Sequence, residues 1–263
     1  MGSSFLASSG TAGNVVFDVD GVLLLGGEAI PGAGDAIHRL DAAGLRLLYA
    51  TNNSTRTVDD NADRLGGLLG VAITPEAVVT SAVAATRILT PSDDPILVVG
   101  EAGLEDTLER AGHALTAEWE QAATVVAGLD RGITYDRLAG ATRSIRSGAR
   151  FVGTNGDLTF PVPGGQVPGA GALLAAIEAA TGVAPEVAGK PHAAMREAIA
   201  DRLAPGPVWM VGDRPETDLA MAAAAGWSGV LVLTGVGDRA AAARWEPALV
   251  LDDVTGLPTA LGV

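Results

Sequence analysis

Short apolar runs alternate with amphipathic segments along the chain, and most apolar runs end in polar or small residues. The runs at 15–17, 45–50, 96–100, 123–128, 150–153, 187–189, 207–211 and 229–233 have the length and β-branched content of buried strands. Helices are expected between them, at 33–43, 59–69, 101–111, 136–147, 169–180, 192–203 and 217–225, with glycines such as Gly44 and Gly226 as stop signals. This alternation predicts an α/β fold with parallel sheets covered by helices.

The same pattern predicts two domains. From about Val79 onward, strands and helices alternate independently of the flanking segments, which indicates an inserted α/β domain over residues 81–186. Residues 14–80 and 187–263 then form one discontinuous domain. Residues 1–13 are small and polar and lack the basic and apolar regions of a signal peptide, so they are expected to form a flexible leader.

Two carboxylates follow the first predicted strand, in Asp18-Val19-Asp20-Gly21-Val22. In open α/β sheets, ligands bind at the carboxyl ends of the strands. Two acids this close repel each other unless a cation lies between them, so the pair predicts a hard divalent metal such as Mg2+. Taken alone, so short a sequence is more typical of an ordinary acidic turn, and its meaning depends on partners further along the chain.

Further polar clusters follow other predicted strands. Thr51-Asn52-Asn53-Ser54 comes after the strand at 45–50, where hydroxyl, amide and backbone N–H groups at a helix start can hold phosphate. A plain helix N-cap explains this segment equally well. Lys190 follows the run at 187–189 and is the single Lys among 17 basic residues, which favours a role for a compact ammonium group.

Composition narrows the class of partner. The net charge of −14 argues against nucleic acid and anionic membranes, which bind basic surfaces. The apolar runs are too short to cross a bilayer. The absence of Cys excludes disulfides, thiol nucleophiles and thiolate metal sites, and it is compatible with a cytoplasmic protein.

A fourth cluster, Gly212-Asp213 through Thr217-Asp218, follows the strand at 207–211. The four clusters, in this order, resemble the motifs of the haloacid dehalogenase superfamily, and most closely its NagD-like or p-nitrophenyl phosphatase branch. Further stretches that look like this branch are 128–130, 134–135 and 154–161. The resemblance implies a doubly wound, Rossmann-like core with an α/β cap, which fits between Thr51 and Lys190, 139 positions apart.

The resemblance also implies catalytic roles. Asp18 is expected to attack phosphorus and form an aspartyl-phosphate, while Asp20 serves as general acid and then general base. Mg2+ is expected between Asp18, the backbone carbonyl of Asp20, and Asp213, with Asp218 orienting Lys190 or a metal-bound water.

The remaining implied residues bind the substrate. Thr51, Asn52, Asn53 and Lys190 are expected to hold the phosphoryl oxygens. From the cap, Asn155, Asp157 and Phe160 are candidates to face the rest of the substrate.

The sequence therefore predicts a Mg2+-dependent phosphatase for a small phosphorylated metabolite, and the branch it resembles would fit a homodimer through the cap. Glycerol phosphate, phosphoglycolate, sugar phosphates and nucleoside monophosphates all remain open as substrates. Two alternatives are a nucleotide-sugar transferase with Asp18 and Asp20 as a metal clamp, and a receiver-like signalling module phosphorylated on Asp18. The first leaves Lys190 and Asp213 unexplained, and receivers have about half this length.

Overall fold

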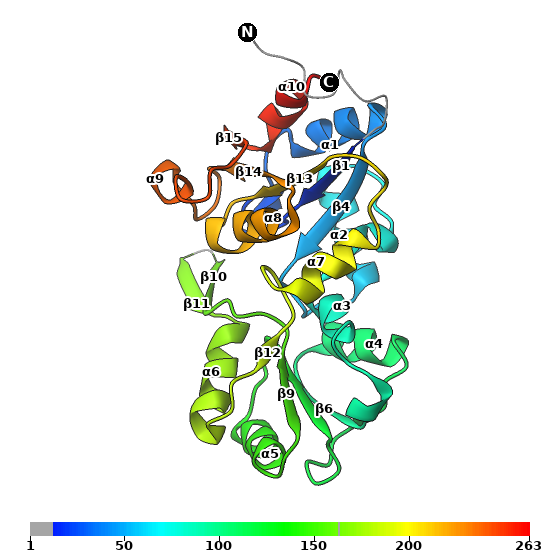
Figure 1. The fold of residues 1–263 in the computed structure, drawn as a ribbon, viewed down its shortest axis with the longest axis vertical. Coiled ribbons are helices and arrows are strands. Elements are labelled where there is room, and N and C mark those ends of the chain that lie inside the picture. The colour runs from blue at the N-terminus through cyan, green and yellow to red at the C-terminus, as the bar shows by residue number, and fades with distance from the viewer. Residues whose placement is uncertain (1–12, 163) are drawn as a thin grey trace. The chain divides into compact units, whose positions relative to one another are not determined.

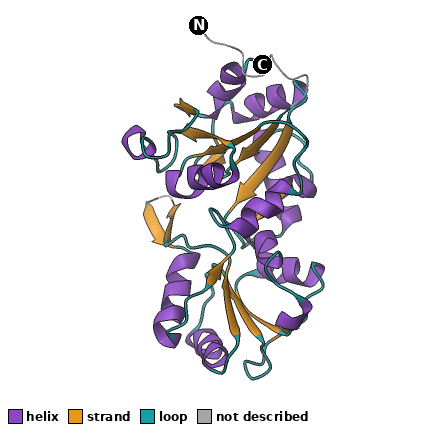
Figure 2. Cartoon of the chain, in the orientation of Figure 1, coloured by secondary structure: helices purple, strands orange, loops and turns teal. Residues whose placement is uncertain are grey.

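A computed structural model describes residues 13–162 and 164–263 (Figures 1 and 2). The described residues divide into two compact units, the first comprising 13–50, 62–78 and 199–263, and the second comprising 51–61 and 79–198. The predicted inserted domain, 81–186, falls within the second unit, and the exact boundaries 14–80 and 187–263 stay a prediction. Of the predicted leader, residues 1–12 lie outside the described residues, while the Gly13 carbonyl accepts a hydrogen bond from the Arg46 amide.

The first unit is built on a six-stranded sheet in the order β15-β14-β13-β1-β4-β5. Its strands are β1 (Asn14–Phe17), β4 (Arg46–Thr51), β5 (Val78–Thr80), β13 (Val208–Gly212), β14 (Ser228–Val232) and β15 (Leu249–Leu251). The β1 strand pairs in parallel with both β13 and β4, and all four of its residues are buried. A strand covered on both faces does not alternate in polarity, which is why Val15, Val16 and Phe17 are all apolar. The buried Asn14 side chain donates hydrogen bonds to the Ala204 and Pro207 carbonyls.

Helices and a small hairpin accompany this sheet. The α-helices are α1 (Ala33–Ala42), α2 (Val58–Leu69), α8 (Ala220–Ala225), α9 (Arg239–Ala242) and α10 (Leu257–Leu261), whereas most of α7 (Ala193–Ala200) belongs to the second unit. The hairpin pairs β2 (Leu24–Leu25) with β3 (Glu28–Ala29). Helix α1 buries Ala33, Ala36, Ile37 and Leu40, the spacing of one helical face. The helix predicted at 217–225 instead begins with a π-helical turn over Pro215–Leu219, which runs directly into α8.

The second unit has its own five-stranded sheet, in the order β12-β9-β8-β6-β7. The strands are β6 (Ile96–Val99), β7 (Leu115–Thr116), β8 (Thr124–Ala127), β9 (Arg150–Gly153) and β12 (Glu186–Val187), and every pair is parallel. The helices are α3 (Ser81–Thr86), α4 (Ala102–Arg110), α5 (Tyr135–Arg146) and α6 (Ala170–Thr181). Val99, Val125, Phe151, Leu174 and Ile177 belong to its apolar core. The α/β fold class is confirmed for both units.

One prediction is wrong at the level of elements. The turn-forming residues at 154–161 predict a loop there, but the end of this stretch belongs to β10 (Thr159–Val162), which pairs antiparallel with β11 (Gly165–Pro168). Pro161 and Pro168 weaken any strand signal because proline cannot donate to a ladder, and a two-stranded ribbon tolerates them. Among the described residues, no helix is both long and apolar enough to cross a membrane.

Candidate active site

Three carboxylates gather at the carboxyl ends of β1 and β13. Asp18 follows β1, and Asp213 follows β13, the strand that pairs with it in parallel. One carboxylate oxygen from each of Asp18, Asp213 and Asp218 lies within 4.8 Å of those of the other two. Asp213 and Asp218 are only 4% and 0% exposed, and Asp18 is half-buried. Buried anions this close are stable only with a compensating positive charge, so the cluster has the character of a cation site.

Asp213 is held by the loop that follows β14. Its Oδ2 accepts a hydrogen bond from the Val236 amide at 2.9 Å, and its backbone carbonyl accepts one from the Gly237 amide at 2.9 Å. A Cβ on Gly235 would overlap the same carboxylate, so the loop approaches as closely as only glycine allows. These residues were not predicted to belong to the site, although a polar segment after the strand at 229–233 was a usable signal.

Asp18 and Asp20 sit in different environments. The Asp18 amide donates to the Val211 carbonyl at 2.8 Å, and its Oδ1 accepts from the Val19 amide at 2.7 Å, so backbone contacts orient the carboxylate. Asp20 is exposed, and its backbone bridges to Leu24 where the β2–β3 hairpin begins.

Asp218 is part of the carboxylate cluster itself. It lies in the π-helical turn, where its Oδ2 accepts a hydrogen bond from the Arg214 amide at 3.1 Å. A Cβ on Gly212 would lie 2.1 Å from the Asp218 Cβ, so this close packing depends on glycine. The sequence suggested only a supporting role for Asp218, but its carboxylate is placed as well for a cation as that of Asp213.

The second unit carries the amide- and hydroxyl-rich group with Lys190. Thr51 ends β4, and its Oγ1 accepts a hydrogen bond from the Asn53 amide at 3.1 Å. Asn52 Oδ1 accepts from the Lys190 amide at 2.8 Å, which brings the second and third predicted motifs together. Lys190 is 3% exposed. Burial lowers the pKa of His192, so its imidazole is neutral at neutral pH and leaves the positive charge of this segment to Lys190.

The three predicted cap residues separate into two groups within the second unit. Asn155 and Asp157 both contact Asn52. Phe160 lies on β10, half-buried, opposite Val167 of β11. Because the carboxylate cluster belongs to the first unit and Lys190 to the second, a common site containing both stays a prediction.

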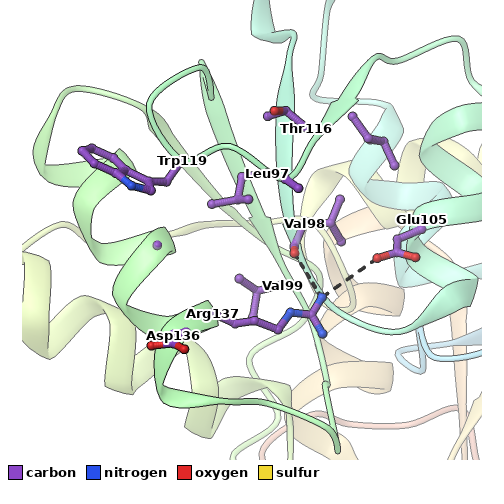
Figure 3. A pocket seen from close by; sticks show the side chains of 11 residues that line it. Leu97, Val98, Val99, Glu105, Thr116, Trp119, Asp136 and Arg137 are labelled. Atoms are coloured by element: carbon purple, nitrogen blue, oxygen red, sulfur yellow. Dashed lines mark hydrogen bonds and ion pairs between the residues drawn. The ribbon is translucent and has the colours of Figure 1, made fainter.

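A pocket of about 520 Å³ in the second unit is lined by residues of β6, α4, β7 and α5 (Figure 3). None of the predicted site residues lines it. Its Arg137 pairs with Asp130 at 2.6 Å and Glu105 at 4.0 Å, and it donates to the Val98 carbonyl at 3.3 Å. Since Asp136 adds a further acid to the lining, the pocket does not suit a phosphate dianion.

Comparisons with known proteins agree on one family. Residues 15–114 match the model of haloacid dehalogenase-like hydrolases, and residues 187–257 match a second model described as HAD-hydrolase-like. An acid sugar phosphatase of Staphylococcus haemolyticus is 37% identical over 225 residues, which cover 84% of this chain and 85% of that protein.

Solved structures extend the similarity to the whole fold. A glycerol phosphate phosphatase of Mycobacterium tuberculosis, solved in complex with magnesium, has a TM-score of 0.85 at 35% identity, over 94% of this chain and 76% of that one. NagD of Escherichia coli K-12 has a TM-score of 0.83 at 31% identity, over 93% of this chain and 98% of that one.

Proposed function

Because this chain belongs to the haloacid dehalogenase-like hydrolases, we propose that it is a Mg2+-dependent phosphatase for phosphate monoesters of small metabolites. The NagD-like branch expected from the motifs is confirmed by the fold shared with NagD. The observation that carries the proposal is the convergence of Asp18, Asp213 and Asp218 within 4.8 Å at the carboxyl ends of parallel strands. Family membership favours a phosphatase over the transferase and receiver alternatives.

The carboxylate cluster fits Mg2+, since this ion prefers hard oxygen ligands and few of them need to come from the protein. Asp18, Asp213, Asp218 and the backbone carbonyl of Asp20 would hold it. The bound ion would neutralise negative charge shared by the attacking carboxylate and the phosphoryl group. The magnesium complex of the mycobacterial phosphatase supports this choice of metal.

The proposed reaction proceeds in two displacements. Asp18 attacks phosphorus and forms an aspartyl-phosphate, while Asp20 protonates the leaving alkoxide as its bond to phosphorus breaks. Asp20 then takes a proton from water, whose oxygen attacks the same phosphorus, releases inorganic phosphate and restores the Asp18 carboxylate. Splitting the reaction in this way replaces one difficult step by two easier ones.

In this proposal, the phosphoryl oxygens are bound by the amide- and hydroxyl-rich group around Lys190 in the second unit. We propose that Thr51, Asn53, Lys190 and the backbone N–H of Asn52 donate hydrogen bonds to them, with each well-placed donor worth about 3 kcal/mol in rate. The closeness of Asn52 to Lys190, 2.8 Å from Oδ1 to the backbone amide, supports a shared role.

The proposed substrates are small esters of the sugar, glycerol, phosphoglycolate or nucleoside monophosphate type, and p-nitrophenyl phosphate is a suitable probe. One relative is named an acid sugar phosphatase and another a glycerol phosphate phosphatase, so the names of the relatives point to different members of this class. Phe160 is the proposed contact for the organic part. A homodimer through the cap would fit the branch that the sequence resembles, and light scattering after size-exclusion chromatography tests whether the protein is a dimer.

The test is Asp18→Asn, which keeps the shape of the side chain but removes the nucleophile. Hydrolysis of p-nitrophenyl phosphate with Mg2+ should fall by at least about a thousandfold, and acid quenching should trap no phosphoenzyme. Asp63→Asn, an equal charge change at an exposed position of α2, should keep wild-type activity. Normal turnover by Asp18→Asn, or wild-type turnover that resists chelation of Mg2+, would contradict the proposal.

A further inference from the structure

Lys190 follows the edge strand β12 in the sheet of the second unit. β9 and β12 pair in parallel, with Val187 opposite Gly153. The pairing continues beyond both strands, because the Ala188 amide donates to the Gly153 carbonyl at 2.9 Å and the Gly189 amide donates to the Thr154 carbonyl at 2.7 Å. The backbone therefore reaches Lys190 alongside the loop that follows β9.

The side chain of Asn52 forms hydrogen bonds with both the amide and the carbonyl of Lys190. Its Oδ1 accepts from the Lys190 amide at 2.8 Å, and its Nδ2 donates to the Lys190 carbonyl at 3.3 Å. The same Nδ2 donates to Asp157 Oδ2 at 3.1 Å. Because an ionised carboxylate only accepts hydrogen bonds, Asp157 faces the Nδ2 end of the Asn52 carboxamide. Asp157 therefore holds this carboxamide in the orientation in which it binds the backbone of Lys190.

Asn155 completes this arrangement. Its Nδ2 donates to the Asn52 carbonyl at 2.6 Å, a carbonyl that also accepts from Ser81 Oγ at 2.6 Å. Its Oδ1 accepts from the Asp157 amide at 3.1 Å. Asn155 is 5% exposed and both of its polar atoms are engaged inside the protein, so its carboxamide has little left to offer a substrate.

Close packing restricts movement of the hydrogen-bonded residues Asn52, Asn155, Asp157 and Lys190. A Cβ on Gly189 would lie 2.6 Å from Asn52 Oδ1 and 2.6 Å from the Thr154 carbonyl oxygen. A small rotation of the Asn52 carboxamide therefore displaces the backbone of Lys190.

We propose that Asp157, acting through Asn52, is a positioning residue for Lys190. The loop after β9 then controls how firmly the phosphoryl group is held, whichever ester carries it, instead of selecting the organic part as the sequence suggested for Asp157 and Asn155. This inference rests on the proposed function, in which Lys190 binds phosphoryl oxygens.

The test compares Asp157→Ala with Asp157→Asn, which keeps an oxygen that can accept from Asn52. Asp136→Ala, the same truncation at an exposed position of α5, is the matched control. Turnover of p-nitrophenyl phosphate, glycerol phosphate and adenosine monophosphate is measured with inhibition by inorganic phosphate. Hydrogen exchange of the Lys190 amide, followed by mass spectrometry, reports on position without requiring activity.

Asp157→Ala should weaken phosphate inhibition and speed exchange at Lys190, each by about threefold to tenfold, the effect of one hydrogen bond. The ratios of kcat/KM among the three esters should stay within about twofold of wild type, because a phosphoryl contact is common to all of them. Asp157→Asn should restore most of the phosphate inhibition and of the protection of the Lys190 amide, and Asp136→Ala should leave both at wild-type values. Melting curves confirm that each variant is folded.

Changed ratios among the esters would show that Asp157 selects substrate and would overturn the proposal. Unchanged exchange at Lys190 in Asp157→Ala would overturn it as well, independently of activity. A wild-type protein that neither hydrolyses these esters nor binds inorganic phosphate would instead refute the proposed function, and the inference with it.

Discussion

Glycines that face the carboxylates decide the geometry of the site at the scale of single residues. Gly21 has a φ of +91°, and a Cβ there would lie 2.5 Å from the Asp213 carboxyl carbon. Its carbonyl also accepts a hydrogen bond from Thr234 Oγ1 at 2.5 Å. Gly21 therefore serves both the turn after β1 and the approach of Asp213 to Asp18.

Gly21→Ala separates these two roles when it is compared with Gly70→Ala. Gly70 has a φ of +68° and open space around its Cβ position, so both variants should lose about 1–2 kcal/mol of stability from backbone strain. Only Gly21→Ala should also displace Asp213 and weaken Mg2+ binding, by about tenfold or more. Urea denaturation and Mg2+ titration measure the two effects, and equal Mg2+ affinity in both variants would contradict this account.

At the scale of elements, Arg150 secures the pairing of β9 with β12 that leads to Lys190. Its guanidinium contacts Glu186 of β12 at 2.6 Å, Asp93 at 2.9 Å and the Ile88 carbonyl at 2.8 Å. Burial disfavours the charge on Asp93, but hydrogen bonds from Arg150 and Thr90 outweigh it, and the pKa of Asp93 is lowered.

Arg150→Met should destabilise the second unit by about 1–2 kcal/mol near neutral pH, because it removes charge-assisted hydrogen bonds from partly buried acceptors. A carboxylate with a lowered pKa stabilises the fold above its ordinary pKa, and this contribution is lost as the pH falls through the lowered value. The difference in unfolding free energy between Arg150→Met and wild type should therefore stay constant down to about pH 5 and shrink below about pH 4. Urea denaturation across this range tests it, with Arg110→Met, at an exposed ion pair, as the control expected to change less.

At the scale of the whole molecule, three carboxylates make cation binding part of the stability of the first unit. Without a cation, Asp18, Asp213 and Asp218 repel one another within 4.8 Å. An ion that binds only the folded state adds about 2.7 kcal/mol when its concentration is a hundred times its dissociation constant.

Calorimetry should therefore show Mg2+ raising the melting temperature by roughly 5–10 °C over the protein in chelator. Asp213→Asn should lose this shift, yet in chelator it should be at least as stable as wild type, because one repulsive charge is gone. Asp63→Asn should keep the full shift. A wild-type melting temperature that Mg2+ leaves unchanged would contradict a cation site.

Much of the fold and of the candidate site was predictable from local pattern. The run at 15–17 became β1, the run at 150–153 became β9, and the polar residues after the predicted strands included all three carboxylates of the cluster. Pattern reasoning missed β2, β3, β5, β7, β15 and the β10–β11 hairpin, because strands of two to four residues carry little periodic signal. In the hairpin, Pro161 and Pro168 weaken the strand signal further.

By itself, the amino-acid sequence determined most strands of four or more residues and the polar residues that follow them, because burial periodicity is a property of neighbouring residues. Only the tertiary structure decided that Asp218 joins the carboxylates and that Asn155 and Asp157 turn toward Asn52. Those contacts join residues about 100 or more positions apart, as with Asn52 and Asp157, and they depend on strand order, register and the room left by glycines such as Gly189. A local hydrophobic pattern does not specify which distant segments of the chain meet.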